Sequence, residues 1–423
     1  MTSTDPRRAV ETIFRIESAK LIAGLTRLTR DVGLAEELAQ DALVVALEKW
    51  PESGVPDNPG AWLMTTAKNR ALNELVRKKR AARKHEEIGR DVEEEERRDP
   101  APALEDAIDD DVGDDLLRLV FTACHPVLSS EARVALTLRL LGGLSTPEIA
   151  RAFLVPEPTV AQRIVRAKKT LADANVPYEV PRGEELAARL SSVLEVIYLV
   201  FNEGYSATTG DDLMRPALCE EALRLGRVVA GLMPNEAEVH GLVALMELHA
   251  SRTPARTAEN GEAILLPDQN RARWDRLLIR RGLAALERAE SLAPQRGPYT
   301  LQAAISACHA RARTSDETDW ARIAAIYGEL VERTGSPVVE LNRAVAVGKA
   351  EGPARGLEIA DSLVEVPALR EYHLLPTVRG DLLEQLSRFS EAKAEFERAA
   401  SMTKNERERR VLLERASKVS SKA

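Results

Sequence analysis

Apolar residues recur at helical spacing along most of this chain. Val160, Ile164 and Leu171 are separated by four and seven residues, a spacing that places them on one face of an α-helix. Leu34 and Leu38 repeat the pattern further upstream. No stretch alternates apolar and polar residues for long enough to predict a strand. The pattern therefore predicts an all-α protein built from amphipathic helices.

Two neighbouring segments carry opposite charge and mark a boundary. Residues 61–84 hold eight Lys or Arg and one acid, Glu74, whereas residues 86–115 hold fifteen Asp or Glu and three Arg. The acidic segment also contains Pro100 and Pro102 and has little hydrophobic periodicity, so we expect a solvated linker. The sequence thus divides into three helical modules and a linker, at about 7–84, 85–114 (the linker), 115–175 and 184–418.

Composition narrows the class of protein. The chain has 423 residues, of which 44% are hydrophobic and only 4% aromatic, which favours a soluble protein of several helical domains. Its three cysteines, Cys124, Cys219 and Cys308, are far apart. A disulfide framework or a CxxC zinc motif is therefore not available, and a reducing cytoplasm is expected. The six histidines show no metal-ligand spacing, so we expect neither a metal nor a cofactor.

The sequence predicts neither secretion nor membrane insertion. The first residues lack the apolar stretch of a signal peptide, and apolar runs such as Val196–Phe201 are too short to span a bilayer. A net charge of -8 would disfavour a nucleic-acid partner, but it averages over segments of opposite charge. Nucleic-acid binding is therefore judged from local charge.

A helix-turn-helix is predicted within residues 144–171. Ser145 followed by Glu148 fits a capping box, in which each side chain hydrogen-bonds to the other residue's backbone N–H. The helix that starts there should stop before Pro156, and the next should begin near Pro158, because proline suits a first helical turn. Two short helices joined by a tight turn are the result.

The second of these helices has a polar face opposite its apolar one. Gln and Arg can make bidentate contacts to base edges in a major groove, and Lys can contact phosphates. The alternative is an ordinary amphipathic hairpin with a solvated basic face. The candidate DNA-contacting residues are Thr159, Gln162, Arg163, Arg166 and Lys169.

The first module joins an acidic helix to a basic one. Residues 31–50 predict a helix with apolar residues on one side and an acidic outer face. A loop rich in proline and glycine, Pro51–Pro59, leads into the strongly basic helix. A solvated surface would explain the acidic face alone, but not the ordered combination of acidic helix, loop and basic helix.

Together the two modules resemble a known family. The acidic helix, loop and basic helix resemble region two of extracytoplasmic-function (ECF) RNA polymerase sigma factors, and residues 144–171 resemble their region four, in the expected order. The resemblance covers roughly the first 175 residues. It implies a transcription-initiation factor that binds core RNA polymerase through the β′ clamp helices and the β flap. It also implies recognition of promoter DNA, both duplex and single-stranded.

The resemblance assigns roles to residues of the first module. In the family the acidic helix binds the polymerase, which here implicates Glu37, Gln40, Asp41 and Glu48. The loop and basic helix capture the non-template strand of the minus-ten element with one base extruded. That task needs cations for phosphates and aromatic or amide groups for unstacked bases. The residues that supply these groups are Asn58, Trp62, Lys68, Asn69, Arg70, Asn73 and Arg77, although Trp62 is also a candidate for the core.

Two positions depart from the family pattern. Asn73 stands where the family commonly has Asp, and residues 154–158 read Leu-Val-Pro-Glu-Pro where Gly-Val-Ser-Glu-Gly is more usual. We therefore infer no promoter sequence. In the family the linker runs through polymerase channels, and a plain spacer is the alternative for this one.

The third module contains internal repeats. The run LERAESL at residues 286–292 is echoed by FERAASM at 396–402, about three periods of a roughly 34-residue helical repeat later. Residues 375–386, with Gly380 at a close-packing position, and residues 390–399 look like a tetratricopeptide repeat. Stacks of such repeats expose a concave groove, which suits a protein or peptide partner.

Two further motifs precede the repeats. Residues 198–205, YLVFNEGY, end an apolar helix, and residues 266–275, LPDQNRARWD, open another; both resemble stretches of the extension that one group of these sigma factors carries. Gly204 is expected to end the first helix as a C-cap, and Asp268 to begin the second as an N-cap. The alternative is a catalytic or ligand role for Glu203, Asp268 or Arg273.

Three functions are ranked on these grounds. The first is a cytoplasmic sigma factor, not an enzyme, whose tail is a regulator or a partner-binding domain. The second is a DNA-binding activator with a helical-repeat sensor, which has no need of the acidic helix and basic helix in the first module. The third is an enzyme with its active site in the tail. It would need converging titratable residues or a phosphate-binding glycine loop, and the sequence shows neither.

Overall fold

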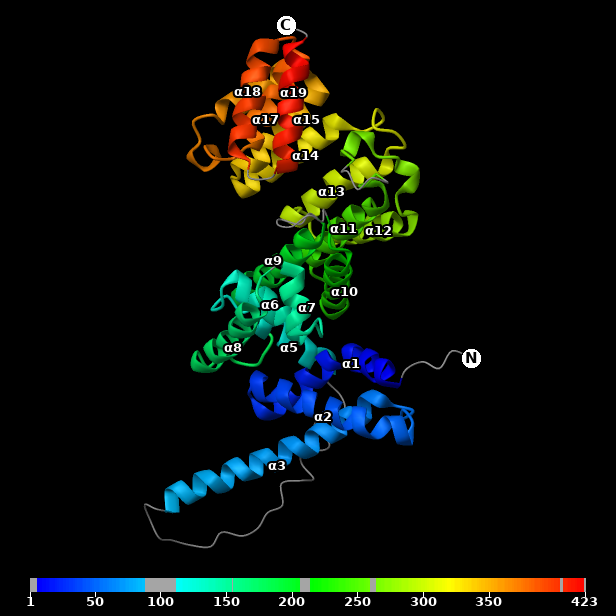
Figure 1. The fold of residues 1–423 in the computed structure, drawn as a ribbon, viewed down its shortest axis with the longest axis vertical. Helices are drawn as coiled ribbons and strands as arrows, with labels where there is room; N and C mark the ends of the chain where they lie inside the picture. The colour runs from blue at the N-terminus through cyan, green and yellow to red at the C-terminus, as the bar shows by residue number, and fades with distance from the viewer. Residues whose placement is uncertain are drawn as a thin grey trace. The chain divides into compact units, whose positions relative to one another are not determined.

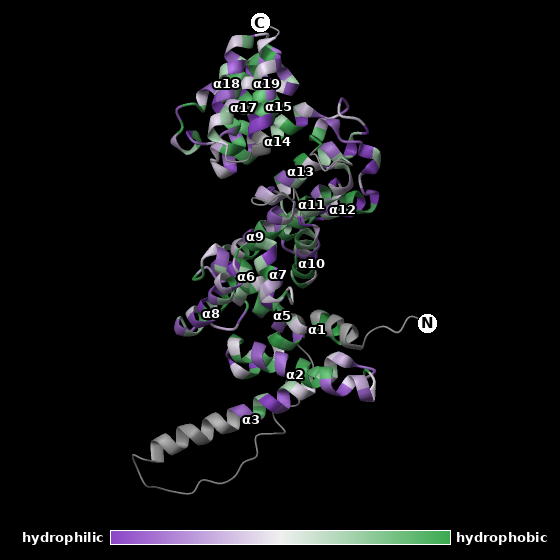
Figure 2. Cartoon of the chain, viewed as in Figure 1, coloured by the Kyte–Doolittle hydropathy of each residue, from purple (hydrophilic) through white to green (hydrophobic). Residues whose placement is uncertain are grey.

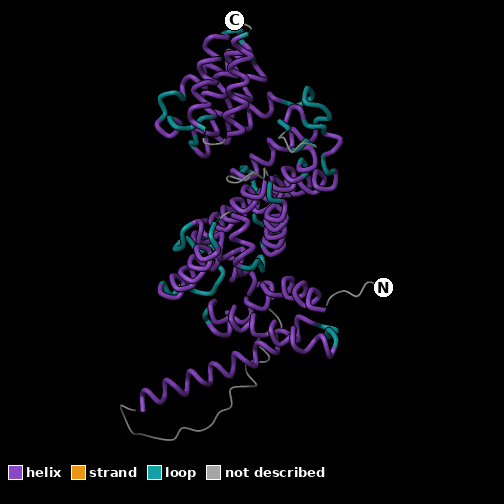
Figure 3. Tube along the Cα trace, viewed as in Figure 1, coloured by secondary structure: helices purple, strands orange, loops and turns teal. Residues whose placement is uncertain are grey.

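The computed structural model shows a chain of helices. Helices joined by turns and loops make up the described residues, and no strand occurs among them (Figure 3). The predicted all-α fold is confirmed. The chain forms two compact units, Met1–Met233 and Pro234–Ala423. The structure describes residues 6–87, 112–153, 155–205, 214–258, 264–403 and 406–421, so most of the predicted acidic linker lies outside the described residues.

The first unit begins with a bundle of three helices, each packed on the other two. They are α1 (Pro6–Thr29), α2 (Val32–Ser53) and α3 (Pro59–Glu87) (Figure 1). The carboxylate of Asp31 starts α2 by accepting hydrogen bonds from the N–H groups of Gly33 (2.8 Å) and Leu34 (3.1 Å), as an N-cap does. Leu38 and Ala42 are buried on the predicted apolar side of α2.

Four helices of the same unit contain the predicted helix-turn-helix. They are α5 (Val112–Ala123), α6 (Ser130–Leu140), α7 (Thr146–Phe153) and α8 (Glu157–Asp173). The Ser145 hydroxyl accepts from the N–H of Glu148 at 3.4 Å, and the Glu148 carboxylate accepts from the N–H of Ser145 at 2.7 Å. The predicted capping box is thus confirmed. The apolar face of α8, Val160, Ile164 and Leu171, is buried as predicted.

The first unit ends with the antiparallel pair α9 (Glu184–Tyr205) and α10 (Pro216–Leu232). α9 packs on α5 and α6. Gly204 is not the predicted C-cap, since α9 continues through it and its φ is not positive. A Cβ on Gly204 would lie 2.6 Å from the backbone nitrogen of Cys219 on α10. The glycine therefore serves the close approach of two helices, a use that local sequence does not distinguish from a cap.

The second unit opens with α11 (Ala237–Ala250), α12 (Arg276–Leu292) and α13 (Pro298–Arg311), and α11 packs on both others. Asp268 is not the predicted N-cap, because it ends a short 3-10 turn, Leu266–Asp268, ahead of α12. Asp275 caps α12 instead, accepting from the N–H groups of Leu277 (2.8 Å) and Leu278 (3.1 Å). The LPDQNRARWD motif contains two aspartates with similar capping chemistry, Asp268 and Asp275, and the path of the chain decides which of them caps α12.

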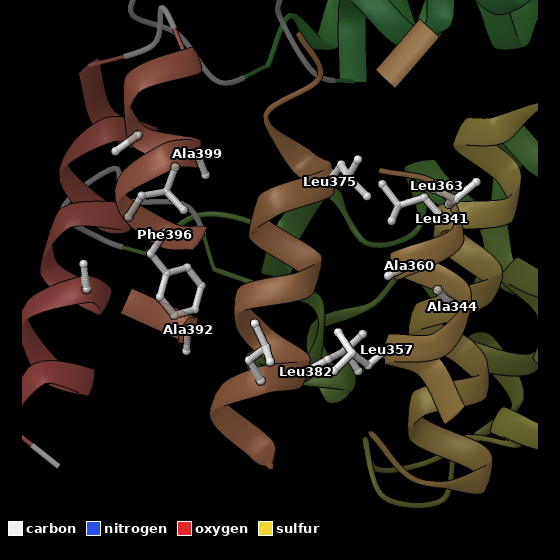
Figure 4. Packing of buried hydrophobic residues seen from close by; sticks show 14 of the residues in the cluster. Leu341, Ala344, Leu357, Ala360, Leu363, Leu375, Leu382, Ala392, Phe396 and Ala399 are labelled. Carbon is white, nitrogen blue, oxygen red and sulfur yellow. The ribbon is translucent and has the colours of Figure 1, made fainter. Parts of the chain in front are cut away.

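The rest of the second unit is a series of helices, each packed on the next. They are α14 (Trp320–Thr334), α15 (Pro337–Glu351), α16 (Pro353–Ser362), α17 (Leu374–Gln385), α18 (Phe389–Met402) and α19 (Glu406–Ser420). Hydrophobic and hydrophilic residues alternate around these helices (Figure 2). The apolar side chains of α15 to α19 meet in one core, in which Phe396 of α18 lies toward α17 (Figure 4). A Cβ on Gly380 would lie 2.7 Å from the Phe396 ring, so the predicted close-packing position is confirmed.

Candidate nucleic-acid interface

An acidic stripe runs along the outer face of α2. Glu37, Asp41 and Glu48 are exposed, and Val44 between them is 51% exposed. Steps of four, three and four residues place all four on one side of the helix; we call these four residues the acidic stripe. Gln40 is half-buried beside it and donates a hydrogen bond to Glu36 at 2.8 Å. The stripe has an apolar centre with charged groups around it, which is a common composition for a protein interface.

The basic helix α3 meets the acidic stripe through an ion pair. Nη1 of Arg70 lies 2.6 Å from Oδ2 of Asp41. Asn69 and Asn73 are exposed on α3, and Lys68 is half-buried. The side chain of Arg77 lies outside the described residues. The structure therefore brings a predicted DNA-contacting residue and a predicted polymerase-contacting residue into direct contact.

Two of the predicted minus-ten residues have structural contacts of their own. The Asn58 side chain accepts a hydrogen bond from the N–H of Ala61 at 3.1 Å and so caps the start of α3. The Trp62 ring packs edge-on against Trp50, with ring centroids 5.2 Å apart. Trp50 is buried, whereas Trp62 is only half-buried. Trp62 thus offers one edge to the core and keeps part of its surface open.

The predicted recognition helix, α8, presents a polar face. Gln162, Arg166 and Lys169 are exposed, and steps of four and three residues place them on one side of the helix. Thr159 and Arg163 are half-buried. The structure thus groups three of the five predicted residues on one open surface and turns the other two partly inward.

Arg163 lines a cavity of about 240 Å³ between α8 and its neighbours α6, α7 and α9. Glu131, Leu199 and Glu203 also line it. The pKa of the Glu131 carboxyl is lowered, first by a hydrogen bond from its own backbone N–H and then by one from the Ser129 hydroxyl. The positive charge of Arg163 adds to this lowering. Electrostatic attraction to Glu131 therefore draws Arg163 toward the protein.

Glu36 makes polar contacts between helices that the sequence did not predict. Its side chain is 6% exposed, and it pairs with Arg139 of α6 at 2.6 Å and with Lys168 of α8. The helix that carries the acidic stripe is thereby tied to the helix-turn-helix. The available signal was the position of Glu36 on the apolar side of α2, between buried Val32 and Ala39. A charged residue on that side predicts a buried partner.

The LPDQNRARWD motif of the second unit holds helix ends together. The Arg271 guanidinium donates to the carbonyl oxygens of His309 (2.8 Å) and Ala312 (3.0 Å) and to the Thr318 hydroxyl (3.0 Å). Its carbon Cζ lies 5.2 Å from the centroid of the Trp274 ring. Burial, together with the charges of Arg252 and Arg271, lowers the pKa of His309 to about 3. The buried members of the motif are therefore engaged in packing and helix termination.

The three candidate residues for catalysis or ligand binding belong to different units of the chain. Glu203 pairs with Arg215 in the first unit, whereas Asp268 and Arg273 are exposed in the second. Within the described ranges, no group of three or more His, Cys, Asp or Glu is placed to hold a metal ion. No helix among the described residues is long and apolar enough to cross a membrane.

Three protein families match consecutive parts of the chain. Residues 14–81 match Sigma-70 region 2, and residues 118–171 match Sigma-70 region 4. Residues 189–290 match a family of unknown function, DUF6596. The first match covers the acidic stripe and most of α3, and the second covers the helix-turn-helix. The third covers the YLVFNEGY and LPDQNRARWD motifs.

Two relatives place these matches in context. A protein of Rhizobium meliloti, described only as uncharacterized, is 43% identical over 387 residues, which are 91% of this chain and 89% of the relative. The ECF RNA polymerase sigma factor SigL of Mycobacterium tuberculosis is 30% identical over 146 residues, which are 34% of this chain and 76% of that protein. The first relative matches most of this chain, and the second matches about a third of it.

Proposed function

Because this chain belongs to the extracytoplasmic-function (ECF) RNA polymerase sigma factors, we propose that it directs core RNA polymerase to promoters and initiates DNA-templated transcription. One observation carries the proposal. An acidic stripe beside a basic helix is followed, on the same chain, by a capped helix-turn-helix with an open polar face. The protein acts by binding in the cytoplasm, and the polymerase supplies the chemistry.

The acidic stripe is the proposed site for the β′ clamp helices. Glu37, Asp41 and Glu48 provide negative charge around the exposed Val44. Such an arrangement favours a basic partner with an apolar contact at its centre, because charge guides encounter and apolar burial adds affinity. The family resemblance adds Gln40 to this site and the β flap as a second polymerase contact.

Two separate surfaces are the proposed DNA sites. On α3, the exposed amides of Asn69 and Asn73 and the cations of Lys68 and Arg70 suit unstacked bases and phosphates of the minus-ten strand. Trp62 adds a partly open ring; Asn58 and Arg77 complete the set implied by the resemblance. On α8, Gln162, Arg166 and Lys169 face outward to read duplex DNA of the minus-thirty-five element, with Thr159 and Arg163 at its edge.

The extension is proposed to modulate this activity. The helices α14 to α19 pack in sequence, and α15 to α19 share one core, an arrangement that tetratricopeptide-like stacks share. Such a stack offers a groove for a protein or peptide segment. A partner bound there would alter sigma activity through the extension, which is part of the same chain as the sigma regions.

Run-off transcription with purified core polymerase tests the proposal. Core polymerase should start at a promoter, selected from a randomised DNA library, only when the full-length protein is present. The double substitution Glu37→Lys, Glu48→Lys should remove this activity and reduce binding to core polymerase in a pull-down. Glu184→Lys, an exposed charge reversal at the start of α9, is the matched control. Duplex DNA binding without any start by core polymerase would instead indicate an activator.

A further inference from the structure

The helices α9 and α10 donate hydrogen bonds to the C-terminal ends of three helices of region four. Arg189 donates to the carbonyl of Phe121 at 3.1 Å, at the end of α5. Arg224 donates to the carbonyl of Leu141 at 2.5 Å, just after α6. The last carbonyl groups of a helix have no partner within it, and cations are favourable there. The extension thus satisfies carbonyl groups that region four by itself leaves open.

The third of these contacts is made by Arg215, which the YLVFNEGY motif holds in place. The Arg215 guanidinium donates both to the carbonyl of Ala152, in the last turn of α7, and to the carboxylate of Glu203 in the motif. Glu203 is 8% exposed. The backbone N–H of Arg215 donates to the carbonyl of Gly204 at 2.7 Å. A buried carboxylate thus holds an arginine that reaches the end of α7.

The glycine of the motif makes this arrangement possible. Any side chain on Gly204 would collide with Cys219 of α10, so only glycine allows α10 to lie this close to α9. Arg215 immediately precedes Pro216, the first residue of α10. The start of α10 is therefore fixed by the motif, and the arginine is fixed with it.

The position of α8 depends on α7, which Arg215 contacts. α7 has only eight residues and packs on α8. On the side toward α9, α8 faces the cavity of about 240 Å³. α7 thus connects the recognition helix to the extension through Arg215, beside α6, which packs on both α8 and α9.

We infer that Glu203 and Arg215 couple the extension to promoter recognition, with Arg215 as a positioning residue for the helix-turn-helix. This inference rests on the proposed function, in which α8 reads the upstream promoter element. The part of the chain that matches the family of unknown function includes the motif, and it then begins with contacts that set the geometry of region four. A change in the extension that moved α10 would move Arg215 and with it the end of α7.

The test compares Arg215→Met and Glu203→Gln with wild type in the full-length protein. Transcription is measured with core polymerase from two promoters, one with its upstream element intact and one with that element scrambled. The ratio between them should fall by roughly fivefold in either variant, within the range for residues that affect a site without touching its ligand. Arg215→Lys keeps the charge but lacks the forked donor, so its ratio should be intermediate. Arg182→Met, an exposed arginine of the same unit, should leave the ratio unchanged.

Hydrogen exchange separates positioning from general destabilisation and needs no promoter. Amides of residues 146–153 should exchange faster in both variants, while those of α2 keep wild-type rates. If both promoters lose activity equally and exchange in α7 is unchanged, the inference is wrong. If wild-type protein starts transcription at no promoter, the sigma function fails, and faster exchange in α7 alone would still support the coupling. A variant that does not fold is replaced by Arg215→Lys, for which both measurements apply.

Discussion

Nη1 of Arg70 on α3 lies 2.6 Å from Oδ2 of Asp41 on α2, joining the proposed minus-ten surface to the proposed polymerase surface. Both side chains remain largely exposed, at 41% and 55%. An ion pair this open contributes little to folding. The ion pair matters for binding instead. While Asp41 is paired with Arg70, its carboxylate is less available to the polymerase, and the Arg70 guanidinium is less available to DNA.

Asp41→Asn should therefore affect binding more than stability. The free energy of unfolding should change by about 1 kcal/mol or less, the range for exposed pairs. Affinity for core polymerase should fall, because the acidic stripe loses a charge. Urea denaturation and a core-binding titration measure the two quantities. A large loss of stability with unchanged core affinity would contradict this assignment.

Glu36→Ala should be strongly destabilising. The substitution leaves Arg139 and Lys168 without the buried carboxylate that they share, and breaking a buried pair costs about 3–5 kcal/mol. Chemical denaturation of the full-length protein measures the loss in the first unit. The neighbouring Glu37→Ala removes an exposed carboxylate and should change stability by about 0.5 kcal/mol or less. Similar losses for the two variants would show that the Glu36 contacts do not form.

Arg166→Ala should weaken binding to duplex DNA in a salt-dependent way. Arg166 is exposed on the polar face of α8, and loss of one phosphate contact should lower the slope of log affinity against log salt by about 1. Arg163→Ala should change the slope less, because Arg163 is half-buried at the cavity. Fluorescence anisotropy over a salt series gives both slopes. Core binding should be the same for both variants, and its loss would argue against a purely DNA-contacting role.

The second unit should lose stability in acid partly through His309. Its pKa is about 3 in the folded state, against an ordinary value of 6.5. Between these values the unfolded chain binds a proton that the folded chain does not, so stability falls as pH decreases from about 6.5 toward 3. His309→Gln should flatten this dependence in denaturation curves taken from pH 7 to pH 4. His240→Gln, whose ring lies by the Pro234 carbonyl, is the control, and an equal flattening there would refute the assignment.

Local features of this protein could be predicted from the sequence. The capping box of Ser145 and Glu148 involves residues three positions apart. The hydrogen bonds that start the helix therefore lie within one helical turn. The buried face of α8 follows from helical spacing in the same way. The acidic stripe and the exposed face of Gln162, Arg166 and Lys169 are likewise consequences of periodicity along one helix.

Contacts between helices could not be predicted in this way. Gly204 and Asp268 both have capping chemistry, yet Gly204 serves a helix crossing and Asp268 ends a short turn. Arg163 belongs to the polar side of α8 by spacing, but the neighbouring helices enclose part of it in a cavity. The local sequence shows which structural roles a residue can take, and the contacts with neighbouring helices decide which of these roles it has.

By itself, the sequence determined the helical class, the capping box and turn of the helix-turn-helix, and the charged faces, because each depends on residues within a few turns of one another. Only the tertiary structure decided that Glu36 meets Arg139, 103 residues away, and that Arg215 meets the end of α7, 63 residues before it. These pairings depend on how helices pack, and packing brings together residues whose separation along the chain carries no periodic signal.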